Sequence, residues 1–184
     1  PESFFDPAKW QGAIKNDDGS ITVGNSNSVC YWTGKIESGL IAFDMKITNP
    51  SSWPSFTFGE RDMAKSFDSG SQYLIGFKSN QIEFQRFDVG KRTMIYGDKT
   101  FNPIGGPGVP NTDGAKIFEY DKTYSIVTGM IDEPNGTRIV LTINGKNIFD
   151  YTDASDKRLK AGGLFGVYNS GQFTFAPYTG RTDE

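Results

Sequence analysis

The sequence predicts an all-β protein in which two antiparallel sheets pack face to face as a β-sandwich. Its 184 residues include 15 Phe, 8 Tyr and 22 Gly, a composition that favours short strands and tight turns over helices. Segments with alternating apolar and polar residues recur along the chain, and Gly, Asn, Asp and Pro separate them. Helical periodicity is almost absent, so we expect about ten short strands to form a sandwich.

The strands expected in the first half are short and regularly spaced. Val29, Tyr31 and Trp32 surround Cys30 and indicate a strand in which the thiol is buried and structural. The next strands are predicted at residues 39–48, 55–61, 72–78, 81–88 and 91–96. Ser79-Asn80 provides the turn of a hairpin between two of them.

In the second half, turn residues separate the expected strands. Residues 132–136 and the dipeptide Asn144-Gly145 are typical hairpin turns. Residues 153–160 could hold one helical turn. The strands are predicted at 124–131, 137–143, 147–152, 163–168 and 172–176.

The chain is expected to form one domain, residues 1–184, excised from a larger secreted protein. No apolar run has transmembrane length, and the start of the chain does not resemble a signal peptide. The net charge is −3, and the basic residues are scattered. This pattern argues against a nucleic acid or membrane partner, and we expect a monomer.

Residues 101–114, FNPIGGPGVPNTDG, interrupt the regular spacing of strands. This segment contains four Gly and three Pro. Long irregular loops inside compact domains are often functional, so we expect this one to form a wall of a ligand groove, with Asn102 and Asn111 among the contacts. The alternative is a surface excursion without a function.

Several motifs resemble those of a known superfamily. The second half reads YSIVTGMID, RIVLTINGKNIFDYTD and AGGLFGVYNSGQFTF, and the first half contains GLIAFDMKI, SFTFGER and SQYLIGFKSNQIEFQRF. From about residue 20 onward the chain resembles the jelly-roll sandwiches of the concanavalin A-like lectins and glucanases. It is most similar to their laminin-G-like group, which includes non-catalytic modules of bacterial polysaccharide-degrading enzymes such as the levan- and fructan-binding type. The fold hosts both enzymes and lectins.

The residues of the usual catalytic sites are missing. The E-x-D-x-x-E motif of the glucanases does not occur, and Glu83 and Asp88 should lie on opposite faces of their strand. The chain has no histidine, which excludes Ser-His-Asp and Cys-His catalysis. The histidine count does not exclude a lyase that uses a tyrosine base.

The predicted binding surface combines aromatic and hydrogen-bonding residues. If the strands at 55–61, 72–78 and 81–88 are neighbours, their polar side chains should converge on one face. Trp53 is a candidate stacking platform, and Arg61 could fork onto sugar hydroxyls. The alternative is an ordinary solvated sheet face. The predicted ligand-binding residues are Trp53, Glu60, Arg61, Gln72, Tyr73, Glu83, Gln85, Arg86, Asn102 and Asn111.

No cofactor is expected to be required, but a structural calcium ion is conceivable. Calcium prefers several carboxylate and carbonyl oxygens, and relatives often hold one. The candidate ligands are Asp17 and Asp18 in one turn and Asp153 and Asp156 in another region. The first pair is equally compatible with an ordinary turn.

Together these features predict a non-catalytic carbohydrate-binding module with a polysaccharide or oligosaccharide ligand. We expect it to be extracellular, secreted or attached to the cell surface, and joined to catalytic domains in the same polypeptide. One alternative is a glycoside hydrolase or polysaccharide lyase of the same fold with an atypical catalytic set. Another is a cell-surface adhesion or structural domain, which a large exposed apolar patch would favour.

Overall fold

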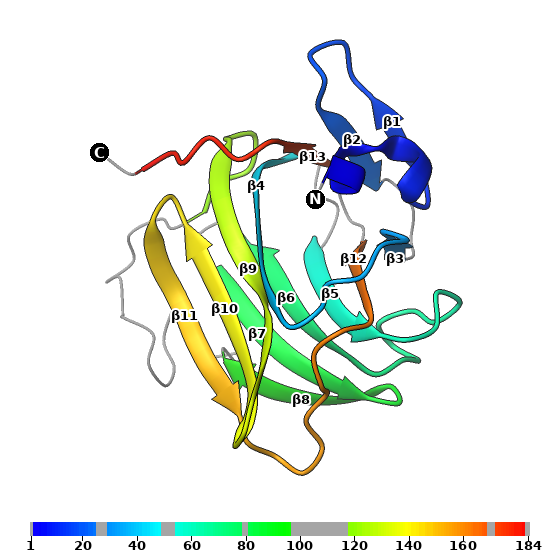
Figure 1. The fold of residues 1–184 in the computed structure, drawn as a ribbon, viewed down its shortest axis with the longest axis vertical. Helices are drawn as coiled ribbons and strands as arrows, with labels where there is room; N and C mark the ends of the chain where they lie inside the picture. The colour runs from blue at the N-terminus through cyan, green and yellow to red at the C-terminus, as the bar shows by residue number, and fades with distance from the viewer. Residues whose placement is uncertain are drawn as a thin grey trace.

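The chain folds into two antiparallel sheets that stack on each other as a jelly-roll β-sandwich. In Figure 1 the strands β9, β10 and β11 of one sheet lie across β6, β7 and β8 of the other. The computed structural model describes residues 2–24, 29–48, 54–78, 81–96, 118–168 and 172–182. In these ranges no helix is long and apolar enough to cross a membrane.

The first sheet has seven strands, and every neighbouring pair is antiparallel. Two short 3-10 helices, η1 (Glu2–Phe5) and η2 (Pro7–Lys9), precede it. In spatial order its strands are β1 (Ala13–Lys15), β2 (Ile21–Gly24), β13 (Gln172–Ala176), β4 (Gly39–Thr48), β9 (Tyr124–Glu133), β10 (Gly136–Ile143) and β11 (Lys146–Asp153).

The second sheet has six strands and is also antiparallel throughout. In spatial order its strands are β3 (Val29–Tyr31), β12 (Leu164–Tyr168), β5 (Ser55–Glu60), β6 (Gln72–Lys78), β7 (Gln81–Asp88) and β8 (Lys91–Tyr96).

The sequence-based assignment of strands is confirmed from residue 39 onward, with boundaries that agree within two residues. In place of the helical turn expected in 153–160 the structure has no helix but an isolated turn, in which Arg158 N–H donates to the Ser155 carbonyl. Ser155 N–H donates to the Asp153 carboxylate and Leu159 N–H donates to the Tyr73 hydroxyl, so backbone donors of this segment bond to side chains. The sequence pattern also missed η1, η2, β1 and β2. The loop at 101–114 lies outside the described residues.

Aromatic rings fill the space between the two sheets. Phe4 is at the centre of this core and contacts the rings of Phe43, Phe165 and Phe175. Trp10 stacks on Phe175 and donates a 2.7 Å hydrogen bond from Nε1 to the carbonyl of Phe4. The N-terminal segment therefore packs into the sandwich and contributes to its apolar core.

Each strand of the six-stranded sheet has one face toward this core and one face away from it, which we call the outer face. Phe56 and Phe58 of β5 are buried in the core, so Thr57 between them belongs to the outer face. Ile75 and Phe77 of β6 are also core residues. Their neighbours at even positions, Gln72, Leu74 and Gly76, therefore lie on the outer face.

Candidate ligand-binding face

Polar side chains from β6 and β7 meet on the outer face. The two strands pair so that Leu74 lies opposite Gln85 and Gly76 lies opposite Glu83. Directly opposed residues of an antiparallel pair point to the same side. Gln72, Glu83 and Gln85 therefore share one surface, as predicted from the sequence; that they contact a ligand remains a prediction.

Glu83 and Gln85 form a local hydrogen-bonded pair on β7. Gln85 Nε2 donates to Glu83 Oε2 over 3.0 Å, and both residues are buried. The expectation that Glu83 and Asp88 face opposite ways is confirmed, because Asp88 accepts a hydrogen bond from Arg86 on the inner side of the strand. The two carboxylates therefore do not form a catalytic pair.

An arc of aromatic side chains surrounds these polar groups. Tyr31 projects from β3 and Tyr168 from β12, and each is adjacent in the chain to a residue buried in the main core. Phe87 of β7 lies opposite Gln72 and therefore shares its face. Phe67 comes from the loop of residues 61–71 that joins β5 to β6, called here the β5–β6 loop. Its ring centroid lies 5.6 Å from that of Phe87 and 4.2 Å from that of Tyr168.

Gly166 makes room for the ring of Tyr31. A Cβ at Gly166 would lie 2.7 Å from Tyr31 Cδ1 and 2.9 Å from Thr57 Oγ1. The Tyr31 hydroxyl donates to the carbonyl of Lys65 over 3.0 Å and lies 3.4 Å from Gln72 Oε1. Burial raises the pKa of Tyr31, and the nearby charges of Glu60 and Asp62 raise it further. The hydroxyl is therefore a neutral donor and not a base at ordinary pH.

Within the described residues, two buried polar atoms beneath this arc have no hydrogen-bond partner. Thr57 and Gln72 are both fully buried, yet Thr57 Oγ1 and Gln72 Nε2 are unsatisfied. A buried polar group without a partner costs about 1–3 kcal/mol. Such groups are rare in folded proteins, and both of these lie on the predicted binding face.

Glu60 was predicted to contact a ligand, but its carboxylate holds the base of the β5–β6 loop. Oε1 accepts hydrogen bonds from the backbone N–H groups of Arg61 and Asp62, and Oε2 accepts one from Ser71. The register between β5 and β12 shifts next to Gly59, whose φ is +90°. This bulge brings Glu60 opposite Leu164 and aims it at its own loop.

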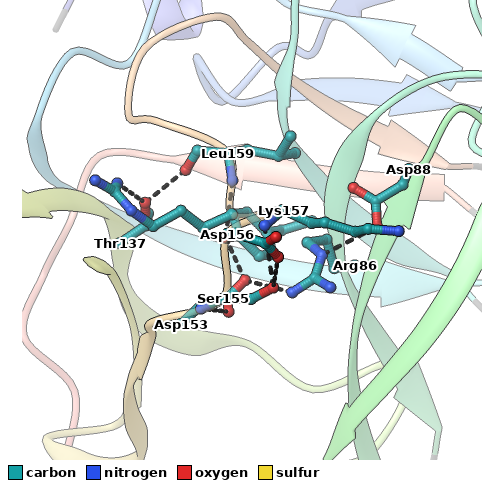
Figure 2. Close-up of polar contacts among 10 residues, drawn as sticks. Arg86, Asp88, Thr137, Asp153, Ser155, Asp156, Lys157 and Leu159 are labelled. Carbon is teal, nitrogen blue, oxygen red and sulfur yellow. Dashed lines mark hydrogen bonds and ion pairs between the residues drawn. The ribbon is translucent and has the colours of Figure 1, made fainter. Parts of the chain in front are cut away.

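Tyr73 and Arg86 were predicted on the ligand face, and the structure places both on the inner side of the sheet. They lie opposite each other on β6 and β7. The Tyr73 hydroxyl and Arg86 Nη1 both donate to Asp153 Oδ2 over 2.7 Å. Figure 2 shows Arg86 together with Asp88 and Asp153 in this network. Because Asp153 ends β11, these contacts join the two sheets.

Electrostatics reinforces this connection between the sheets. Burial lowers the pKa of Arg86, but its hydrogen bonds and ion pairs with Asp153 and Asp88 outweigh burial and raise it overall. Burial raises the pKa of Tyr73, and its hydrogen bond to Asp153 adds to the increase. The Arg86 guanidinium in this network is therefore charged, and the Tyr73 phenol is neutral.

Arg61 lies at the rim of the sheet and is exposed. Its Nη2 donates to the carbonyl oxygens of Lys160 and Ala161 over 3.2 and 3.3 Å. The guanidinium therefore supports the segment before β12, and its contact with a ligand remains a prediction. The candidate contacts Trp53, Asn102 and Asn111 lie outside the described residues.

Three of the four candidate calcium ligands, Asp18, Asp153 and Asp156, have hydrogen-bond partners. Asp18 accepts hydrogen bonds from the hydroxyl and the backbone N–H of Ser20, and these bonds lower the pKa of Asp18. Asp17 is exposed in the same turn.

The second pair of candidates lies at the end of β11. Asp153 is paired with Arg86, and Asp156 lies in the following turn, 3.5 Å from the Ser155 hydroxyl. The described part of the chain contains no group of three or more potential metal ligands; calcium binding stays a prediction.

A groove of about 390 Å³ lies on the other side of the β5–β6 loop, beside the edge strand β3. Residues 63–66 of the loop form one wall. The opposite wall comes from the segment between η2 and β1 and from β2 and β3, and its residues are Gln11, Gly12, Gly24, Val29 and Cys30.

Sequence reasoning missed the four aromatic residues described on this face. Tyr31, Tyr168 and Phe87 could have been found, because each alternates with core residues on its own strand. Phe67 lies in a loop, where no periodicity indicates which way a side chain points.

The chain matches no protein-family model, and a search of curated proteins found no match. Solved structures do show similarity. The carbohydrate-binding module CBM66 from Bacillus subtilis is 16% identical, with a TM-score of 0.58, and the match covers 93% of this chain and 94% of that one. A Bacillus subtilis protein with a galectin-like fold is 14% identical, with a TM-score of 0.58, and coverage is 94% and 89%.

The β-glucanase of Bacillus licheniformis is also similar, at 12% identity and a TM-score of 0.51, with 94% of this chain and 83% of that one covered. At such low identities the similarity shows the fold alone. The chain is therefore a jelly-roll β-sandwich of the kind that both a carbohydrate-binding module and a glycoside hydrolase adopt.

Proposed function

We propose that this chain is a non-catalytic carbohydrate-binding domain whose ligand binds on the outer face of the six-stranded sheet. The observation that carries the proposal is the pair of buried, unsatisfied atoms, Thr57 Oγ1 and Gln72 Nε2, on that face. A hydroxyl-rich ligand offers the hydrogen-bond partners that these atoms lack. The aromatic rings around them are suited to stacking on a sugar ring.

The chemistry of the described groups favours binding over catalysis. A retaining glycosidase needs two carboxyl groups on either side of the scissile bond. Glu60 is engaged by three backbone N–H groups, and Asp88 faces away from Glu83 and pairs with Arg86. A lyase that uses tyrosine needs an accessible base, whereas Tyr31 and Tyr73 are buried and their pKa values are raised.

The wider setting is also part of the proposal. We place the domain outside the cell, in a secreted or surface-attached protein, as a monomer joined to catalytic domains. A single module usually binds sugars modestly, and its linkage to an enzyme raises the effective concentration of substrate. A structural calcium ion and the laminin-G-like subtype are the finer elements of the same proposal.

The test begins with a polysaccharide array probed with the isolated chain, followed by calorimetric titration of the best ligand. Gln72→Leu should weaken binding by about 1–3 kcal/mol, because one side-chain partner of the ligand is lost. The matched control is Gln172→Leu, which makes the same change on β13 of the other sheet. Equal affinities for Gln72→Leu and the wild type would remove the outer face as the site.

A second assay separates binding from catalysis. The chain is incubated with the same polysaccharides, and reducing ends and unsaturated uronate absorbance are measured over time. The expected result is no turnover. Activity that survives repurification and disappears in one point variant would replace the binding proposal with the glycosidase or lyase alternative.

A further inference from the structure

The β5–β6 loop lies over the face that the proposed function assigns to the ligand. Phe67 contacts Phe87 of β7 and Tyr168 of β12, and the strands β5 and β6 lie between these two. Its ring therefore bridges the part of the outer face that carries Thr57 and Gln72. The loop occupies this place while two polar atoms beneath it are left without partners.

The body of the loop is held mainly by its own hydrogen bonds. Lys65 N–H donates to the carbonyl of Asp62, and the N–H groups of Ser69 and Gly70 donate to the carbonyl of Ser66. The Ser66 hydroxyl also bonds to Asp68. Residues 62–65 and 68–69 are exposed. A segment with internal bonds and little buried apolar surface is a candidate for local opening as a unit.

The attachments of the loop are concentrated at its base. The Glu60 carboxylate bonds both ends of the loop, through the N–H groups of Arg61 and Asp62 on one side and Ser71 on the other. Gly90 N–H of the β7–β8 turn donates to the Gly70 carbonyl. Away from the base, contacts with the rest of the fold include the ring contacts of Phe67, the hydrogen bond from Tyr31 to Lys65 and the close approach of the Asp68 backbone to Gly90.

There is also space beside the loop. The groove of about 390 Å³ separates residues 63–66 from Val29 and Cys30 at the edge strand β3. This groove leaves space next to the loop body into which residues 63–66 could shift. Hinged movement of a segment about a few residues at its ends is a common way to open a binding site.

We propose that the β5–β6 loop is a displaceable cover, and that Phe67 occupies the position of a ligand ring until the ligand displaces it. This inference rests on the proposed function, since it describes how access to that site is regulated. The open state supplies the groups that bind ligand, Thr57 and Gln72 among them. Because only the open fraction binds, the apparent affinity is lower than the intrinsic affinity by that fraction.

The first test measures opening without any ligand. Cys30 is the one cysteine of the chain, so Cys30→Ala gives a background in which Thr57→Cys carries the single thiol. The rate of reaction of this thiol with a small aromatic disulfide reagent reports exposure of the outer face. Phe67→Ala should raise this rate about tenfold or more, because the ring contacts that hold the cover closed are lost.

Met63→Ala is the matched control, because it shortens an exposed side chain of the same loop and should change the rate less than about twofold. Phe67→Leu keeps an apolar contact without the ring, so its labelling rate should lie between those of the wild type and Phe67→Ala. It provides a second measurement if Phe67→Ala does not fold. The melting temperature of each variant identifies global unfolding. If the protein with Phe67, the Phe67→Leu variant and the Phe67→Ala variant are all folded and all react at the same rate, the loop is not a displaceable cover.

The second test titrates wild type and Phe67→Ala with the polysaccharide that the array identifies. The cover predicts tighter binding by the variant, by about fivefold or more, since the internal competitor is gone. Weaker binding together with an unchanged labelling rate would mean that Phe67 contacts the ligand, and would overturn the cover. Faster labelling with no binding to any polysaccharide by either protein would support the cover and contradict the proposed function.

Discussion

The two faces of the six-stranded sheet are both largely buried, but they are filled in different ways. The inner face is packed by aromatic rings from the opposite sheet, and its charged group, Arg86, is paired with Asp153 at 2.7 Å. The outer face is covered by the β5–β6 loop and retains two polar atoms without partners. In the described part of the chain the ionic group of the inner face is paired, whereas the outer face has two unsatisfied polar atoms that our proposal assigns to a ligand.

The largest expected effect comes from breaking the ion pair on the inner face. Arg86→Ala should lower the free energy of unfolding by about 3–5 kcal/mol, because it leaves the buried Asp153 carboxylate without its cation. Urea unfolding measures this loss. The matched control is Arg138→Ala, which breaks an exposed 2.6 Å pair with Asp150 and should cost about 0–1 kcal/mol.

We attribute the contribution of Arg86 to stability to burial of its ion pair and not to the N–O distance. Equal losses of unfolding free energy in Arg86→Ala and Arg138→Ala would contradict this view. Polysaccharide binding by folded Arg86→Ala should match that of the wild type, because the guanidinium faces away from the proposed site. A selective loss of binding at unchanged stability would return Arg86 to the ligand face, where it was expected from the sequence.

The same comparison explains what the sequence could predict. A strand with one buried face must alternate with period two, and β4, β6 and β7 were found on that basis. Alternation also puts Arg86 on the same face as Ile82 and Phe84, although Arg86 was predicted among the ligand contacts. The partner of Arg86 was not visible, because Asp153 lies 67 residues away in the chain.

The outer face was predicted only in part. Gln72, Glu83 and Gln85 were identified because polar residues alternated with core residues on strands that are neighbours. The cover was not predictable, because residues 61–71 form a loop without periodicity and its position depends on contacts of Phe67 with two distant strands. The bonds of Glu60 to its own loop were not predictable either, because they depend on the bulge at Gly59.

A smaller effect should appear at alkaline pH, where each face contributes one buried tyrosine. The pKa values of Tyr31 and Tyr73 are raised above their ordinary value of 10.0. Above that value the unfolded chain loses these protons while the folded chain retains them, so stability falls as pH rises. The expected slope is up to about 1.4 kcal/mol per pH unit for each tyrosine.

Urea unfolding from about pH 9 to about pH 11 measures this slope. Tyr31→Phe and Tyr73→Phe should each make it shallower, and the double variant should make it shallower than either. A slope that neither substitution changes would mean that other groups cause the alkaline loss of stability. Tyr73→Phe should also lower stability at neutral pH, because it removes a hydrogen bond to Asp153.

The smallest effect, and the one that most sharply tests the outer face, concerns the Thr57 hydroxyl. Thr57→Val replaces an unsatisfied hydroxyl with a methyl group of similar shape and should raise the free energy of unfolding by about 1 kcal/mol. Thr128→Val is the matched control, because Thr128 is equally buried but donates a 2.8 Å hydrogen bond to the Val140 carbonyl. That substitution should lower the free energy of unfolding by about 1 kcal/mol. If Thr57→Val raises the free energy of unfolding and Thr128→Val lowers it, the Thr57 hydroxyl destabilises the folded protein. Such a cost is expected of a group that binds a ligand. A loss of stability at both positions would mean that Thr57 has a partner in the folded protein, and the main argument for a site on the outer face would fail.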